Sequence, residues 1–113
     1  MAAVLIVDDE PDLRLLLRVA FESSGHAVAE AANGRDALRH LETNTADVVV
    51  TDLAMVGMGG IELIRRIRDR SQTIPVVAIS ADWEALEHAP ADVRIRKPFD
   101  PFAVVSAAMN LVA

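Results

Sequence analysis

Polar side chains follow several of the apolar segments in this sequence. These residues are Asp8 and Asp9 after residues 4–7, Asp52 after 48–51, Ser80 after 74–79, and Lys97 after 93–96. Three carboxylates held close together repel one another unless a cation joins them. Because the donors are oxygens, with no His or Cys nearby, a hard divalent ion such as Mg²⁺ is the expected cation.

These residue types also suit phosphoryl transfer. A carboxylate beside Mg²⁺, an ammonium and a hydroxyl can attack a phosphoryl group and hold it. We therefore predict Asp52 as the nucleophile, with Lys97 neutralising the phosphoryl oxygens and Ser80 supplying the hydroxyl. Without the metal an acidic pocket repels phosphate, so the prediction requires the ion.

The elements that position these side chains follow from the apolar segments. Three of them, residues 4–7, 48–51 and 74–79, are nearly continuous apolar runs, typical of strands buried on both faces of a parallel sheet, whereas residues 93–96 alternate between apolar and charged. Residues 27–29 add a short, weaker strand. We predict a flavodoxin-like α/β fold, a doubly wound five-stranded parallel sheet of order 2-1-3-4-5, in one domain over residues 1–113. Ligands bind beyond the carboxyl ends of such strands, where the first and third strands are neighbours.

Helical periodicity between the strands predicts helices with buried apolar stripes. The predicted stripes are Leu13, Leu16, Leu17, Ala20 and Phe21; Ala37, Leu38 and Leu41; Ile61, Leu63, Ile64 and Ile67; and Phe102, Val105, Met109 and Val112. Residues 83–88 allow only a short fourth helix. The arginines of residues 65–70 lie opposite an apolar stripe in an acidic chain, which favours a solvated helix face over a nucleic-acid site.

Composition excludes several classes of protein. The chain has 113 residues, of which 52% are hydrophobic and 25% charged, and its formal net charge is −6. This charge argues against nucleic-acid binding, and the lack of cysteine excludes disulfides and thiolate zinc sites. No apolar run approaches the roughly 18 residues of a membrane span. We expect a cytoplasmic protein with neither nucleic-acid nor membrane partners.

Four ordered motifs resemble a known family over essentially the whole chain. They are Val7-Asp8-Asp9-Glu10-Pro11, Asp52 with Met55 and Gly60, Ser80-Ala81, and Lys97-Pro98-Phe99. Together they resemble the receiver domain of response regulators in two-component signalling, of the single-domain, chemotaxis-regulator-like kind.

The resemblance implies a function and a set of roles. Asp52 would accept a phosphoryl group from a histidine kinase or a histidine phosphotransfer protein, and the change would control a downstream protein. Asp9, Asp52 and the backbone carbonyl of Ala54 would bind Mg²⁺, with Asp8 acting through water. Ser80 would be the switch hydroxyl, and Lys97 would contact the phosphoryl oxygens. Such a domain is not an enzyme beyond its own phosphorylation and dephosphorylation, and we expect a monomer or weak dimer.

The sequence departs from the family pattern at three places. Val56 and Gly59 replace a proline and an aspartate in the loop after Asp52, which predicts a more mobile loop. Arg94 stands where the family usually has an aromatic residue, and we expect it to be exposed and to pair with Asp82, with Glu84 or with the acidic surface of a partner protein. The segment between Ser80 and Arg94 is also several residues shorter than usual.

Three alternative functions use similar residues. An aspartate-nucleophile phosphatase needs a second acid two residues after the nucleophile, but that residue is Ala54. A flavin or nucleotide module needs a glycine- or hydroxyl-rich loop after the first strand, where Asp8 and Asp9 stand. A receiver-like interaction module that is never phosphorylated is expected to lack part of the aspartate and lysine set, which is complete here.

Overall fold

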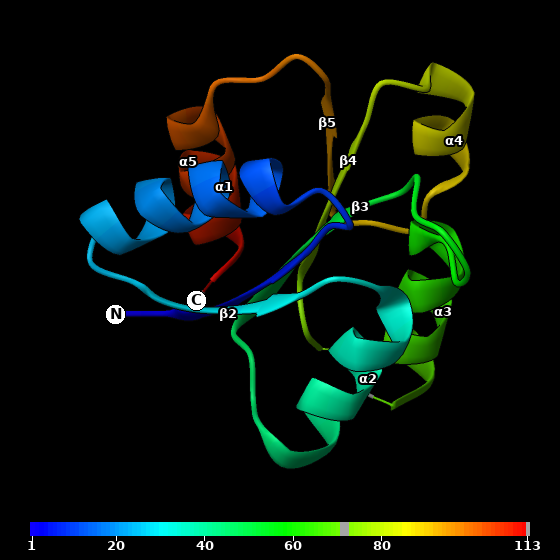
Figure 1. The fold of residues 1–113 in the computed structure, drawn as a ribbon, viewed down its shortest axis with the longest axis horizontal. Coiled ribbons are helices and arrows are strands. Elements are labelled where there is room, and N and C mark those ends of the chain that lie inside the picture. The colour runs from blue at the N-terminus through cyan, green and yellow to red at the C-terminus, as the bar shows by residue number, and fades with distance from the viewer. Residues whose placement is uncertain (71–72, 113) are drawn as a thin grey trace.

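Five parallel strands form one sheet in the computed structural model, which describes residues 1–70 and 73–112. The strands are β1 (Ala3–Val7), β2 (Ala27–Ala31), β3 (Val48–Asp52), β4 (Val76–Ser80) and β5 (Val93–Arg96). Their order in the sheet is β2-β1-β3-β4-β5, with every neighbouring pair parallel (Figure 1). The predicted fold class and strand order are thereby confirmed.

Helices cover both faces of the sheet (Figure 1). They are α1 (Pro11–Ser23), α2 (Gly34–Thr43), α3 (Gly60–Arg70), α4 (Trp83–His88) and α5 (Pro101–Leu111). Apolar residues of α1 and α5 pack together on one face, and those of α2, α3 and α4 belong to the core on the other. Within the described ranges, no helix is long and apolar enough to cross a membrane. The fourth helix has six residues, as the short segment predicted.

The central strand shows why these segments are apolar throughout. Val49 belongs to the core shared with α2, α3 and α4, whereas Val48 and Val50 belong to the core shared with α1 and α5. Successive side chains of a strand point to opposite faces, and here both faces are covered. A polar residue at any of these three positions would be buried without water, so the sequence cannot alternate between polar and apolar.

Two predicted core residues are exposed. Leu16 on α1 is 47% exposed and Phe102 on α5 is 55% exposed. The buried residues of these helices are Leu17, Ala20 and Phe21 in α1, and Val104, Val105 and Ala108 in α5. Both helices carry apolar residues on more than one side, so periodicity alone did not decide which side packs against the sheet.

Short polar caps determine where the last two helices begin. The Asp82 side chain accepts hydrogen bonds from the backbone N–H groups of Glu84 and Ala85, and the Asp100 side chain accepts one from Phe102. These side chains satisfy donors that the first turn of a helix leaves unpaired. The caps start α4 and α5 soon after β4 and β5 end, and because all five strands are parallel their carboxyl ends lie at one edge of the sheet.

Candidate functional site

Four of the predicted site residues meet at the carboxyl edge of the sheet. Asp8 follows β1, Asp52 ends β3 and Ser80 ends β4, and each is at most 3% exposed. Lys97 follows β5, and its Nζ lies 3.0 Å from Asp52 Oδ2. The sheet order brings these residues together, because β1, β3, β4 and β5 are successive neighbours. A buried carboxylate and a partly exposed ammonium thus form an ion pair at the centre of the edge.

Asp8 and Asp52 belong to a cluster of four acidic residues. One carboxylate oxygen from each of Asp8, Asp9, Glu10 and Asp52 lies within 4.8 Å of the others. An all-oxygen set at this spacing suits a hard divalent cation. Glu10 was not predicted as a member, because in the sequence it is equally suited to the exposed entry of a helix, and only the turn after β1 brings it to the cluster.

The crowding of these groups changes their pKa values. The pKa of Asp8 is raised from 3.8 to about 6, chiefly by burial and also by the charge of Asp52, although the hydrogen bond from the Glu10 N–H acts in the opposite direction. Burial by itself lowers the pKa of Lys97, but its hydrogen bond with Asp52 and the nearby negative charges raise that pKa overall. One ammonium therefore leaves uncompensated negative charge at the cluster.

Backbone groups of the loop after β3 contact the acidic cluster. The N–H of Ala54 donates to Asp52 Oδ1 at 3.1 Å, and the N–H of Val56 lies 3.4 Å from Asp9 Oδ2. Ala54 therefore lies beside Asp52, with which it was predicted to bind Mg²⁺. That its carbonyl binds a metal stays a prediction.

Gly60 controls how closely α3 approaches Asp52. A Cβ added to Gly60 would overlap the backbone oxygen of Asp52 and lie 2.6 Å from Leu53 Cα, whereas one added to Gly59 would lie 3.6 Å from its nearest neighbour, the Leu53 oxygen. We expect Gly60→Ala to lower the free energy of unfolding by about 1–3 kcal/mol, because backbone must move to relieve the overlap. Gly59→Ala should change it by less than about 1 kcal/mol in chemical denaturation. Equal effects of the two substitutions would contradict this close packing.

Ser80 is held in place beside the ion pair. Its Oγ accepts a hydrogen bond from the Asp82 N–H at 3.0 Å, and its carbonyl accepts one from the Lys97 N–H at 2.9 Å. The hydroxyl proton of Ser80 donates to no described residue. Ser80 is therefore tied to both the start of α4 and the end of β5, while its hydroxyl can still donate to a ligand.

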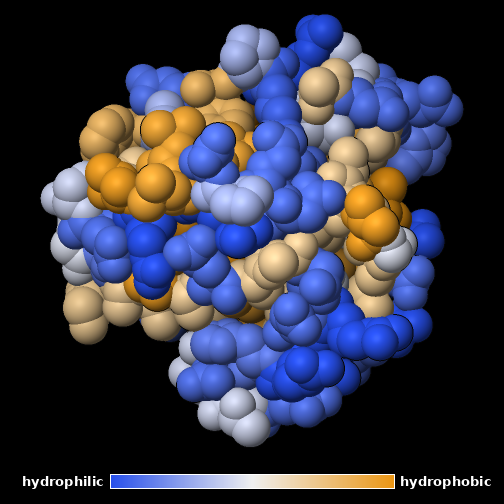
Figure 2. Space-filling model, in the orientation of Figure 1, coloured by the Kyte–Doolittle hydropathy of each residue, from blue (hydrophilic) through white to orange (hydrophobic). Residues whose placement is uncertain are grey.

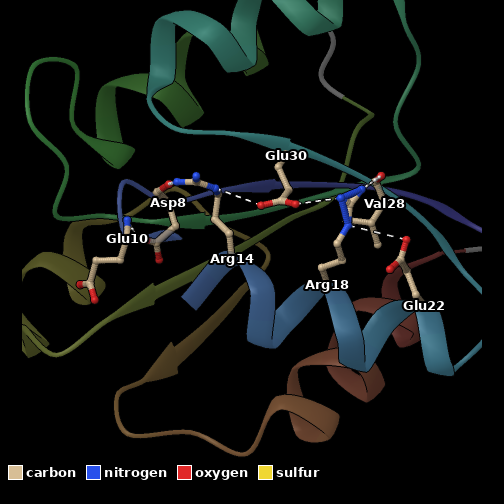
Figure 3. A network of polar contacts seen from close by, with 7 residues as sticks. All are labelled: Asp8, Glu10, Arg14, Arg18, Glu22, Val28 and Glu30. Carbon is tan, nitrogen blue, oxygen red and sulfur yellow. Dashed lines mark hydrogen bonds and ion pairs between the residues drawn. The ribbon is translucent and has the colours of Figure 1, made fainter. Parts of the chain in front are cut away.

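A network of polar contacts supports the end of β1 (Figure 3). Nη1 of Arg14 donates to the Asp8 carbonyl at 2.5 Å, and its Nε pairs with Glu30 Oε1 at 3.0 Å. The other oxygen of Glu30 pairs with Arg18 Nη1 at 2.8 Å. Arg14 and Glu30 were not predicted from the sequence, where the only signal is two arginines at the i, i+4 spacing of one helix face. The network joins β2 and α1 to the backbone that carries the acidic cluster.

Arg94 is exposed on β5, as predicted, but its expected pairing with Asp82 or Glu84 is wrong. Its Nη2 donates to the carbonyl of Ala89 at 2.7 Å, whereas we predicted Asp82 or Glu84. Ala89 is the C-cap of α4, where carbonyl groups lack partners within the helix. The short helix therefore offers Arg94 a nearer acceptor at its end than the acids at its start.

Trp83 contacts the strand that leads to Lys97. The guanidinium carbon of Arg96 lies 5.1 Å from the centre of the Trp83 ring, which is the geometry of a cation–π interaction. Trp83 begins α4 just after Ser80, and Arg96 immediately precedes Lys97. The pair therefore joins the segments that carry two site residues.

The sequence is similar to those of known response regulators over most of its length. The family model described as the response regulator receiver domain matches residues 4–108. The chain is 37% identical over 109 residues to an uncharacterized 14.6 kDa protein from Leptolyngbya boryana, covering 90% of this chain and 83% of that protein. It is 40% identical over 108 residues to the transcriptional regulatory protein ResD of Bacillus subtilis, covering 90% of this chain but 44% of ResD. The chain thus spans less than half of ResD.

Solved structures of similar proteins share the whole fold. A putative response regulator from Chloroflexus aurantiacus has a TM-score of 0.92 at 28% identity, with 98% of this chain and 97% of that chain covered. Chemotaxis response regulator CheY4 of Vibrio cholerae has a TM-score of 0.88 at 27% identity, with 98% of both chains covered. The response regulator TrrA of Thermotoga maritima, solved in complex with Mg²⁺–BeF, has a TM-score of 0.88 at 27% identity, covering 98% and 99%. From its sequence, its sheet order and the acidic edge with its single lysine, this chain belongs to the response regulator receiver domain family.

Proposed function

We propose that this receiver domain is a phosphoacceptor in which Asp52 takes a phosphoryl group. The observation that carries the proposal is the position of Asp52, a carboxylate 3% exposed at the end of β3 and 3.0 Å from the ammonium of Lys97. A buried carboxylate of purely structural use would be costly at this position. Here the positive charge of Lys97 stabilises the buried carboxylate of Asp52, and it can also neutralise the oxygens of an incoming phosphoryl group.

The transfer uses the side chains of this chain as follows. A carboxylate oxygen of Asp52 attacks the phosphorus of a phosphohistidine, forming a P–O bond as the P–N bond breaks, and the leaving imidazole takes a proton from solvent. Lys97 shifts from its pair with Asp52 to the phosphoryl oxygens. Ser80, whose hydroxyl proton donates to no described residue, donates to the same group. The resulting aspartyl phosphate draws Lys97 and Ser80 to its phosphoryl oxygens. This change in their contacts favours the conformation that a downstream protein binds.

The acidic cluster fits Mg²⁺ as the cofactor. Its donors are all carboxylate oxygens, and the pKa of Asp8 is raised first by burial and then by the negative charge of Asp52, both of which a bound cation would offset. Asp8, Asp9 and Asp52 would hold the ion with the carbonyl of Ala54, and Glu10 lies close enough to contribute. When bound, Mg²⁺ supplies positive charge for the phosphoryl oxygens. TrrA, which has the same fold, was solved with Mg²⁺–BeF, which supports this assignment.

The phosphoryl donor would be a histidine kinase or a histidine phosphotransfer protein. An apolar patch lies over α1 and α5 beside the site (Figure 2), and Leu15, Leu16, Val19 and Phe102 are its exposed members. A groove of about 480 Å³ lined by Leu16, Lys97 and Phe99 joins this patch to the site. A donor protein that buries the patch would bring its histidine to the edge where Asp52 lies.

Acetyl phosphate with Mg²⁺ tests the phosphoacceptor proposal. We expect the wild type to gain one phosphoryl group by intact-protein mass spectrometry, because the small donor replaces the kinase. Asp52→Asn should gain none, since an amide is no nucleophile here. Asp69→Asn, at an exposed position of α3, is the matched control and should behave as the wild type.

Three results would contradict the proposal. A phosphoryl group on the Asp52→Asn variant would place the acceptor elsewhere. Multiple turnover of a simple phosphomonoester, measured by phosphate release, would instead favour an aspartate-nucleophile phosphatase. Absence of any mass gain in the wild type would favour an interaction module that is never phosphorylated.

A further inference from the structure

A groove of about 600 Å³ lies between α2 and α3, and its walls carry long charged side chains. The charged residues that line it are Arg35, Arg39 and Glu42 from α2, and Glu62, Arg66 and Arg70 from α3. No member of the acidic cluster lines it. In the sequence the arginines of α3 were interpreted as a solvated face. The fold places two of them opposite two arginines of α2, which periodicity along one helix could not reveal.

The groove carries excess positive charge in an acidic protein. Four guanidinium groups face two carboxylates, although the formal net charge of the chain is −6. Arg66 pairs with Glu62 at 2.9 Å and Arg39 with Asp36 at 3.5 Å, but these side chains are 46% to 70% exposed. Exposed ion pairs of this kind are weak, so a ligand anion can redirect them. Arg35 makes no hydrogen bond or ion pair with any described residue.

The volume and lining of the groove suit a compact ligand. Arg70 is held at its wall, because its Nη1 donates to the Leu38 carbonyl at 3.1 Å and its Nη2 lies 3.6 Å from Glu42 Oε1. Leu38 and Met58 add apolar surface between the two rows of charge. The volume lies within the range of pockets for small molecules, about 300–1,000 Å³. A ligand with both an anionic and an apolar part would use both kinds of lining.

We propose that this groove binds a small organic phosphate with at least two negative charges. Guanidinium groups bind phosphate oxygens through two parallel hydrogen bonds, which makes them strong and geometrically selective partners for phosphate. An extended nucleic acid is disfavoured by the negative charge of the rest of the molecule. Arg35, which has no hydrogen bond or ion pair to give up among the described residues, makes the first contact with the phosphate.

Calorimetric titration with ADP and with inorganic pyrophosphate tests the proposal. Buffer without divalent metal prevents either probe from reaching the acidic cluster together with Mg²⁺. We expect saturable binding of ADP, tighter than that of pyrophosphate because the apolar lining contacts the nucleoside. Arg35→Gln and Arg66→Gln should each weaken it by about tenfold or more, since each removes charge-assisted hydrogen bonds. Arg65→Gln, which removes the same charge from α3 outside the groove, is the matched control and should bind as the wild type.

Several outcomes would overturn the proposal. Absence of saturable binding by both probes, or an equal loss of affinity in Arg65→Gln, would show that the arginines only solvate the surface. Binding of a phosphoserine peptide without binding of ADP would make the groove a protein contact. Repeating the titration with Asp52→Asn separates this site from the phosphoacceptor proposal, because the groove should bind ADP equally well in that variant.

Discussion

Asp8→Asn is expected to make the metal-free protein more stable than the wild type near neutral pH. Burial and the charge of Asp52 raise the pKa of Asp8 from 3.8 to about 6. Because the folded state binds this proton more tightly than the unfolded state, the stabilisation is fully present below about pH 4 and is lost as the pH rises through about 6. The loss amounts to at most about 3 kcal/mol, since one pKa unit corresponds to about 1.4 kcal/mol. Asparagine carries no charge and its Oδ1 can still accept the hydrogen bond that Glu10 N–H donates.

Chemical denaturation in the presence of a chelator, at several pH values, measures this effect. The difference between wild type and Asp8→Asn should be largest above pH 6 and should shrink towards pH 4. Asp69→Asn, which neutralises an exposed carboxylate outside the cluster, should show little difference at any of these pH values. If Asp8→Asn were less stable than the wild type across this range, the Asp8 carboxylate would be a structural partner and the repulsion argument would fail.

The same experiment with Mg²⁺ in place of the chelator should shrink the stability difference between the two proteins. A ligand that binds only the folded state stabilises it by about 2.7 kcal/mol at 100 times its dissociation constant. Removing the Asp8 carboxylate weakens the proposed site, so Mg²⁺ should stabilise the wild type more than the variant. An equal gain in both proteins would mean that the metal acts at another site or unspecifically.

Lys97→Met is expected to lower the free energy of unfolding of the metal-free protein by about 2–3 kcal/mol. Breaking a fully buried ion pair costs about 3–5 kcal/mol, because the remaining charge is left without a partner. Here the Asp52 side chain is 2% exposed and that of Lys97 is 23% exposed, so the loss should be somewhat smaller. Methionine keeps much of the length of the side chain, and the backbone hydrogen bond of Lys97 to Ser80 is unaffected.

A double-mutant cycle identifies the pair as the cause. In the Asp52→Asn background, Lys97→Met should cost clearly less, because its hydrogen-bonded partner is then uncharged and only the charges of Asp8 and Glu10 still act on the lysine. Arg65→Gln removes one positive charge elsewhere and controls for the change in net charge. An equal loss in both backgrounds would assign the effect to packing of the lysine side chain instead of its charge.

The fold could be predicted from the sequence because its signals are local and repeated. Strands such as residues 48–51 are apolar throughout, and only a sheet covered on both faces buries such a segment completely. Helices alternate with these strands, which leaves a doubly wound sheet as the simple arrangement. Leu16 and Phe102 show the limit of this inference. Where a helix is apolar on several sides, its packing partners decide which side is buried, and these partners lie far away in the sequence.

The gathering of the site residues was also predictable, since Asp8, Asp9, Asp52, Ser80 and Lys97 all stand at strand ends and strand order follows from the fold. Contacts between elements distant in the sequence were not. Arg14 supports the Asp8 backbone because Glu30 holds it from β2, and the arginines of α2 and α3 form a groove because the two helices pack side by side. The sequence by itself thus determined which chemical groups this protein has and at which edge they lie. Only the tertiary structure decided their partners and charges, because burial and electrostatic interactions depend on distances in space and not on separation along the chain.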